Sequence, residues 1–273
     1  MHISARRAGL VIGVAATVAL TAVLGWSSDV CAQDVAHGRS LYMTNCKTCH
    51  GRPENNFHDI VEDGGNNPDG LYKAWLANPS YMIEFASFPY EDAADIAAYL
   101  GTFLDTPPLP VVVEYYHAGF DHYFTTSSAD EITKLDDGTI TGWARTGEQF
   151  NAYPRMDVDG SLTSVCRFFS TAFAPKSSHF YAPLGVECNA VKQNPNWSFE
   201  GETFIVEVPD DGGYGFCPPG TAPVYRLYNN GQGGAPNHRY TTKLAVRSQM
   251  LAIGYVAEGK GPLGIVMCAP SPE

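Results

Sequence analysis

Apolar residues follow three patterns in succession along the chain. The first is a run over residues 10–26 that is broken only by small residues. The second is helical spacing, with apolar positions three or four residues apart, at Leu71, Trp75 and Leu76 and again at Ile96, Tyr99, Leu100 and Phe103. Beyond residue 110 the aromatic residues gather in short blocks separated by turn residues, which is typical of strands. The pattern predicts an apolar leader, a helical region and a β-rich region.

The leader has the features of an export signal. Arg6 and Arg7 precede the apolar run, and Val30-Cys31-Ala32 supplies the small residues that a signal peptidase requires. We expect residues 1–32 to be a signal peptide that is cleaved after Ala32, which places the mature protein in the periplasm, in the medium or on the cell surface. A retained membrane anchor is the alternative, because an apolar run of about 17 residues lies at the lower limit of a spanning helix. After cleavage, no integral membrane association is expected.

The helical region contains the motif Cys46-Lys47-Thr48-Cys49-His50. Two thiols one helical turn apart can each add to a haem vinyl group, and the adjacent imidazole can then bind the iron. The motif predicts one covalent haem c that is held by Cys46 and Cys49, with His50 as the proximal axial ligand. The alternative is a redox dithiol or half of a zinc site.

The segments on both sides of this motif resemble class I cytochromes c. Residues 34–51, DVAHGRSLYMTNCKTCHG, are similar to the N-terminal helix of that family, in which the residues matching Gly38 and Tyr42 pack against the C-terminal helix. The helix expected over 91–104 contains DIAAYL, which is again similar to the family pattern. The resemblance implies an all-α cytochrome c fold over 33–105, and prolines in 106–110 mark a linker after it.

Met82 is the residue that we expect as the distal axial ligand. It follows the proximal His by 32 residues and precedes Tyr99 by 17, which is the relation of the distal Met to the closing helix in small class I cytochromes. Met82 could instead fill a gap in the core. The other candidate ligands are Met43, which lies badly for crossing the haem plane, His37 and His58.

Three segments beyond residue 110 share one order of blocks. Each has an aromatic strand, a second strand that begins with His, a short helix such as that expected over 242–252, and a Gly-Trp-like pair with Gly four residues on. The aromatic strands contain Val113–Tyr116, Cys166–Phe169 and Tyr225–Tyr228, the histidines are His122, His179 and His238, and the later aromatics are Trp143, Trp197 and Tyr255. The order predicts a β-rich α+β module of three pseudo-repeats over 111–270, which buries its aromatic faces by stacking or ring closure.

These segments resemble a bacterial secreted repeat family of unknown function. Its pattern is an aromatic strand, His-Phe-Tyr-Thr-Thr, and Gly-Trp with Glu-Gly beyond, and the third segment matches it best. The resemblance implies an architecture and brings no activity. A metal site made by the three repeated histidines is the alternative to a structural role, but none has an acidic or thiol pair nearby. Because residues 111–270 also contain no nucleophile elbow, metalloprotease helix or phosphate loop, we do not expect an enzyme.

Cysteine usage agrees with export. Signal cleavage leaves six cysteines, and with Cys46 and Cys49 bound to haem an even number remains, which indicates two disulfides in an oxidising compartment. Because each pair falls inside one repeat, we predict Cys166–Cys188 and Cys217–Cys268. Two other connectivities stay open.

Charge restricts the partners. The chain has a net charge of −12, so nucleic acid is not an expected partner. Residues 34–105 carry four basic and eleven acidic residues, which favours a redox partner with a neutral or basic docking face. Exposed Tyr and Trp edges on the β-rich module would suit a glycan or another envelope ligand.

Three functional hypotheses follow. The first is an exported monohaem cytochrome that carries single electrons and uses its C-terminal module for docking. The second is an envelope-binding or adhesion protein in which the haem domain is accessory. The third is a small haem enzyme of the peroxidase kind, which would need an open coordination position on the iron.

Overall fold

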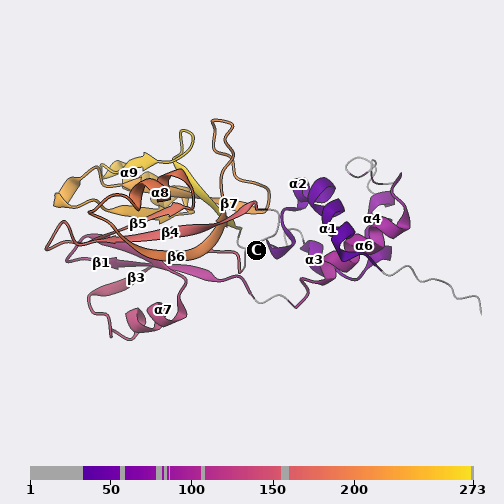
Figure 1. Ribbon diagram of the computed structural model, residues 1–273, viewed down its shortest axis with the longest axis horizontal. Helices are drawn as coiled ribbons and strands as arrows, with labels where there is room; N and C mark the ends of the chain where they lie inside the picture. Colours follow the sequence, from indigo (N-terminus) through magenta and orange to yellow (C-terminus); the bar gives the residue numbers. More distant parts are fainter. Residues whose placement is uncertain are drawn as a thin grey trace, which may run out of the picture. The chain divides into compact units, whose positions relative to one another are not determined.

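The computed structural model describes residues 33–55, 59–77, 82, 85, 87–105, 108–154 and 160–271. Helices form the N-terminal region and strands dominate the C-terminal region (Figure 1). The predicted signal peptide, His58 and the first two residues of the predicted linker lie outside the described residues. In the ranges given above, no helix is long and apolar enough to cross a membrane.

The haem motif lies on a nearly continuous helical segment. Helix α1 (Val35–Leu41) begins at Asp34, whose carboxylate accepts hydrogen bonds from the backbone N–H groups of Ala36 and His37. A π-helical turn, η1 (Tyr42–Cys46), follows, and α2 (Lys47–His50) completes the segment. The helix ends at Gly51, whose φ of 67° lies in the left-handed region that glycine adopts without strain.

The other helices of this region are α3 (Ile60–Gly64), α4 (Pro68–Ala77) and α6 (Tyr90–Gly101). Helix α6 crosses α1 so closely that a Cβ on Gly38 would overlap the Asp95 carbonyl group, and the Tyr42 and Tyr99 rings lie 5.8 Å apart. The expected packing of Gly38 and Tyr42 against the C-terminal helix is therefore present. The helix is shorter than expected, because residues 102–105 form turns instead of a further helical turn.

The C-terminal region contains two antiparallel sheets. The smaller has the order β2-β1-β3, formed by β1 (Val111–His117), β2 (His122–Thr126) and β3 (Trp143–Asn151). The larger has the order β5-β4-β6-β10-β7-β8, with β9 also paired to β7. Its strands are β4 (Leu162–Ser170), β5 (Ser178–Pro183), β6 (Ser198–Glu207), β7 (Thr221–Tyr228), β8 (His238–Thr241), β9 (Val256–Glu258) and β10 (Ile265–Pro270).

A short helix follows the second strand of each predicted segment. These helices are α7 (Ala129–Asp136), α8 (Val186–Val191) and α9 (Leu244–Ala252). Each segment thus reads strand, strand, helix, strand, and its first strand pairs with both of the others. The Gly-Trp-like pair stands at the beginning of the third strand or directly before it.

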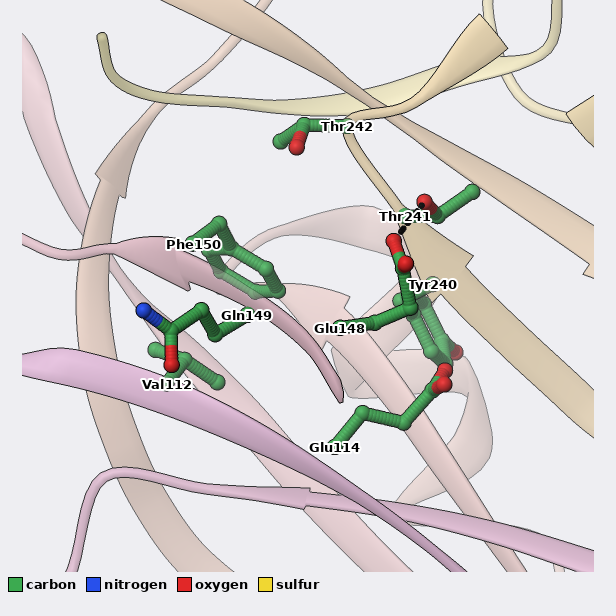
Figure 2. Close-up of a pocket in the computed structure, with 8 residues that line it drawn as sticks. All are labelled: Val112, Glu114, Glu148, Gln149, Phe150, Tyr240, Thr241 and Thr242. Atoms are coloured by element: carbon green, nitrogen blue, oxygen red, sulfur yellow. Dashed lines mark hydrogen bonds between the residues drawn. The ribbon is translucent and has the colours of Figure 1, made fainter. Parts of the chain in front are cut away.

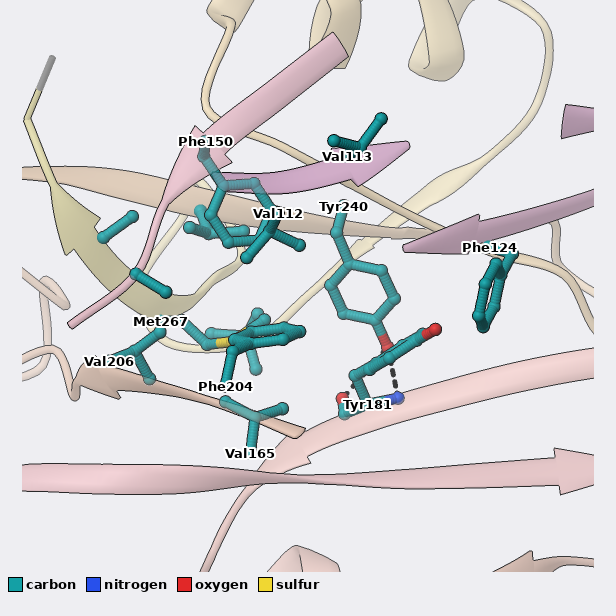
Figure 3. Close-up of a cluster of buried hydrophobic side chains, with 14 of the residues drawn as sticks. Val112, Val113, Phe124, Phe150, Val165, Tyr181, Phe204, Val206, Tyr240 and Met267 are labelled. Atoms are coloured by element: carbon teal, nitrogen blue, oxygen red, sulfur yellow. Dashed lines mark hydrogen bonds between the residues drawn. The ribbon is translucent and has the colours of Figure 1, made fainter. Parts of the chain in front are cut away.

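One buried cluster joins the two sheets, and Figure 3 shows its aromatic centre. The Tyr181 hydroxyl donates to the Thr125 carbonyl oxygen at 2.7 Å, and the Tyr240 hydroxyl donates to the Tyr181 carbonyl oxygen at 3.0 Å. Because β2, β5 and β8 supply these three residues, the second strands of all three segments are linked by buried tyrosines. The structure also pairs Cys166 with Cys188 and Cys217 with Cys268, which is the predicted connectivity.

Candidate haem-attachment site

The two thiols of the haem motif stand apart from the other cysteines of the chain. Among the residues that the structure describes, Cys46 and Cys49 are the free cysteines, while the other four form the two disulfides. Cys46 is partly buried and Cys49 is exposed. Burial raises the pKa of the Cys46 thiol to about 12, so this thiol stays protonated in the ligand-free protein.

The π-helical turn determines how the motif leaves α1. The backbone N–H of Lys47 donates to the Tyr42 carbonyl oxygen, five residues earlier, and the Asn45 amide donates to the Leu41 carbonyl oxygen at 2.9 Å. Such turns place an extra residue in a helix and occur frequently at functional sites. The turn ends at Cys46, the first of the two thiols that are predicted to bind haem.

Tyr42 forms a hydrogen bond to the chain just beyond His50. Its side chain is fully buried, and its hydroxyl donates to the Gly51 carbonyl oxygen at 3.1 Å. Burial also raises the pKa of Tyr42 well above its ordinary value, so the hydroxyl remains a donor. The half-buried His50 is therefore followed by a glycine that is fixed both by its backbone conformation and by a buried hydrogen bond.

Met82 is partly buried and packs against the same hydrophobic cluster as Cys46. Aromatic side chains belong to the same cluster or pack against it: the Trp75 ring lies 6.3 Å from that of Phe85 and 6.0 Å from that of Phe88. Such an apolar environment suits a haem, which is large and mostly hydrophobic. Met82 remains the predicted distal ligand on this evidence.

The alternative ligands differ in their surroundings. His37 Nδ1 lies 2.9 Å from an Asp95 carboxylate oxygen, with 48% of the histidine side chain exposed. The hydrogen bond to Asp95 raises the pKa of His37 and favours its protonated form, which cannot bind iron. Met43 packs on the helical core beside the motif, and His58 lies outside the described residues.

The repeated histidines do not converge on one point. His122 Nε2 and His179 Nδ1 lie within hydrogen-bonding distance at 2.9 Å, whereas His238 contacts Glu258. Within the described ranges, no group of three or more His, Cys, Asp or Glu residues is arranged to hold a metal ion. The structural role expected for these histidines fits their contacts.

A buried polar junction, defined here as Arg52, Asn55, Tyr153 and Glu207, ties the loop after the motif to the strands. Arg52 Nε donates to Glu207 Oε1 at 3.1 Å, and only 2% of Arg52 and 3% of Glu207 are exposed. The Tyr153 hydroxyl also donates to Glu207 at 2.8 Å, and the Asn55 amide donates to that hydroxyl at 3.1 Å. Sequence reasoning missed this junction, because Arg52 and Glu207 are 155 residues apart. An arginine two residues after the motif was the one available signal.

Comparisons with known proteins define the class of the helical domain. Residues 33–100 match the family model described as cytochrome C oxidase, cbb3-type, subunit III, so the helical region is a cytochrome c-type domain. Such a domain implies haem c and fits an electron carrier better than an enzyme.

The family is identified by a match over the larger part of the chain. Residues 110–263, more than half of the chain, match the domain of unknown function DUF5648, and the chain belongs to that family. No curated protein and no solved structure matches the chain. The two matched ranges have the predicted two-domain layout, with a helical cytochrome region followed by a β-rich region.

Proposed function

We propose that this protein is an exported monohaem c-type cytochrome that carries single electrons and uses its C-terminal region for docking or binding. The observation that carries the proposal is the separation of the cysteines: four are committed to disulfides, and two free thiols stand beside His50 on an apolar helical core. Thiols that stay free while the other described cysteines pair are available for thioether bonds.

The chain's own residues would each contribute one part of the haem site. Cys46 and Cys49 would bind the haem edge, and His50 and Met82 would provide the axial ligands. The iron, when bound, supplies a one-electron redox couple. Trp75 and the neighbouring aromatic side chains would form part of the apolar surroundings of the haem, which would favour an electron carrier over a reaction with small molecules.

The C-terminal region is proposed to consist of three pseudo-repeats, because similar Arg–Glu pairs recur at their junctions. Arg167 of the second segment forms paired hydrogen bonds with Glu131 of α7 in the first. Arg226 of the third segment forms the same arrangement with Glu187 of α8 in the second. The helix of one segment thus supplies the carboxylate for the arginine of the next.

The remaining junction, between the third and first segments, uses the opposite order. Glu114 occupies the strand position that Arg167 and Arg226 hold in the other segments, and Arg239 of β8 donates to it at 2.9 Å. Figure 2 shows Glu114 and Glu148 side by side at this junction, with Thr241 bonded to Glu148. Side chains fill this space and leave no room for a ligand at the junction.

Localisation and partners follow from the sequence features. Export to the periplasm or cell surface is proposed from the predicted signal peptide, and a redox partner with a neutral or basic face from the acidic charge of residues 34–105. A second candidate function is an envelope-binding protein with an accessory haem. The observation that favours it is that the DUF5648 match covers more of the chain than the cytochrome match.

Covalent haem is the decisive test of the leading proposal. The full sequence would be expressed in a bacterium that exports and matures c-type cytochromes, and haem would be stained after denaturing electrophoresis. We expect wild-type protein and the control Thr48→Ala, which keeps both thiols and His50, to retain haem. Cys46→Ala and Cys49→Ala should each lose covalent attachment through that thiol, and the double variant should carry none. Protein that is folded but free of covalent haem would refute the proposal.

The same preparation tests export. The measured mass should correspond to a mature chain that begins at Gln33, and the protein should appear in the periplasmic or extracellular fraction. A mass that includes residues 1–32 would show that the leader is retained.

A further inference from the structure

A pocket on the C-terminal region is lined by aromatic side chains from the second and third segments. Its walls, here called the aromatic pocket, are Phe180, Val191, Trp197, Tyr228, Pro236 and His238. The cavity has a volume of about 220 Å³. Sites for drug-sized ligands usually measure about 300–1,000 Å³, so this pocket suits a single small ring.

The aromatic rings are held in place by the surrounding fold. Tyr228 stacks on His238 with the ring centres 4.9 Å apart, and Phe180 meets His238 edge-on at 5.0 Å. Trp197 and Val191 pack on the buried cluster that contains the Cys166–Cys188 disulfide. The disulfide fixes α8 next to the pocket, so the walls are formed before any ligand arrives.

His238 adds a polar group to these walls. Its side chain is 7% exposed, and its Nε2 lies 3.4 Å from a Glu258 carboxylate oxygen. Because a carboxylate is an acceptor, Nε2 must carry the proton, which leaves Nδ1 as an acceptor on a neutral ring. Nδ1 is buried and has no hydrogen-bond partner among the described residues.

The corresponding histidine of the second segment, His179, has the hydrogen-bond partner that His238 Nδ1 lacks. His179 has the same carboxylate contact, with Nε2 at 3.2 Å from Glu200, but its Nδ1 also lies 2.9 Å from His122 Nε2. Both ring nitrogens of His179 are therefore engaged, whereas one ring nitrogen of His238 is not. A buried polar atom without a partner costs free energy, and a ligand that donates a hydrogen bond would remove that cost.

We propose that the aromatic pocket binds one pyranose ring of a glycan. The apolar face of a sugar ring can stack on Trp197 and Tyr228, and a sugar hydroxyl can donate to His238 Nδ1. Burial lowers the pKa of His238, which favours the neutral ring that can accept such a hydrogen bond. This inference deepens and rests on the binding role proposed for the C-terminal region, and it is independent of electron transfer.

The test uses the full, haem-loaded protein and soluble oligosaccharides of hexoses and N-acetylhexosamines, titrated by calorimetry and by tryptophan fluorescence. We expect saturable binding of at least one oligosaccharide, and Trp197→Ala should weaken it about tenfold or more, as for a buried aromatic contact in a binding site. The matched control is Tyr214→Ala, which removes an exposed aromatic residue outside the pocket and should leave the affinity unchanged.

His238→Phe tests the polar contact while keeping an aromatic ring. It should abolish discrimination between an oligosaccharide and its deoxy analogue, and Trp197→Ala covers the case in which this variant does not fold. Three results would overturn the proposal: no binding to any oligosaccharide, equal binding by Trp197→Ala, or selective binding of proline-rich peptides instead. Haem content and electron exchange are measured on the same samples, so that failure of the pocket is separated from failure of the cytochrome.

Discussion

Single residues at the haem motif have different kinds of support. The thiols and His50 follow from the motif itself, and the structure adds that the two thiols stay free when the other described cysteines pair. Met82 was expected from its distance along the chain, and the structure adds that it packs on the same cluster as Cys46. The assignment of Met82 to the iron therefore remains a prediction with a direct spectroscopic test.

Met82→Ala is expected to remove the weak far-red absorption band that a methionine sulfur bound to ferric haem gives. The reduction potential should also fall, because a Met ligand raises the potential of a cytochrome c. Met43→Ala serves as the control, since this residue lies on the same core but on the helix of the motif. An unchanged far-red band in Met82→Ala would exclude Met82 as the ligand, and His58→Ala would then be the next variant to record.

At the scale of elements, the hydrophobic pattern predicted most of what was seen. The resemblance to class I cytochromes c implied the packing of α1 against α6 at Gly38, and the block order anticipated the strands and helix of each C-terminal segment. Element ends were less predictable. Helix α9 begins at Leu244 instead of residue 242. Thr241 is the last residue of the preceding strand, and Thr242 belongs to the connection between the strand and the helix.

Contacts between elements distant in sequence could not be predicted, because a charge pattern does not specify a partner. The link from Arg52 to Glu207 and the pairing of Arg226 with Glu187 depend on how the chain returns in space. The unpaired nitrogen of His238 was equally invisible, since the three repeated histidines look alike in sequence and differ only in their neighbours.

Loss of the buried polar junction is expected to destabilise the protein. Arg52→Ala would leave Glu207 buried with its main cationic partner removed, which typically costs about 3–5 kcal/mol. Lys47→Ala is the matched control, because Lys47 Nζ lies 3.9 Å from the same carboxylate and is more exposed, so its loss should cost less than about 1 kcal/mol. Denaturant unfolding of haem-loaded protein measures both, and equal small losses would contradict a structural role for the junction.

At the scale of the whole molecule, stability should depend on pH through the buried histidines. Burial lowers the pKa of His122 to about 2, and burial likewise lowers those of His179 and His238. Below pH 6.5 these histidines bind protons in the unfolded chain but stay neutral in the folded chain. The stability that these neutral histidines contribute is therefore present above pH 6.5 and is lost as the pH falls toward the folded-state values.

Three carboxyl groups extend the loss of folding stability to lower pH. Burial alone would raise the pKa values of Glu131, Glu200 and Glu258, but hydrogen bonds from arginine and histidine side chains lower them overall. Their contribution is present above pH 4.5, the unfolded value, and disappears as the pH drops below it. Unfolding free energies measured from pH 8 to pH 4 should decline throughout the acidic range.

A variant can separate the contribution of the histidines to this pH dependence of stability from that of the carboxyl groups. His122→Gln keeps a polar side chain without a titrating ring, so the decline between pH 6.5 and 4.5 should become shallower. His37→Gln is the control, because the hydrogen bond to Asp95 raises the pKa of His37 and its loss should not flatten the acidic decline. If His122→Gln shows the wild-type slope, the buried histidine does not control acid stability.

The division of the cysteines into two disulfides and two free thiols also constrains the order of maturation. Cys166, Cys188, Cys217 and Cys268 are paired in disulfides, and under the proposed function the thiols of Cys46 and Cys49 would have to reach the haem in reduced form in the same compartment. A disulfide between Cys46 and Cys49 would block attachment. The cell must therefore keep one end of the chain reduced while the other end is being oxidised, and the yield of holoprotein should depend on both activities at once.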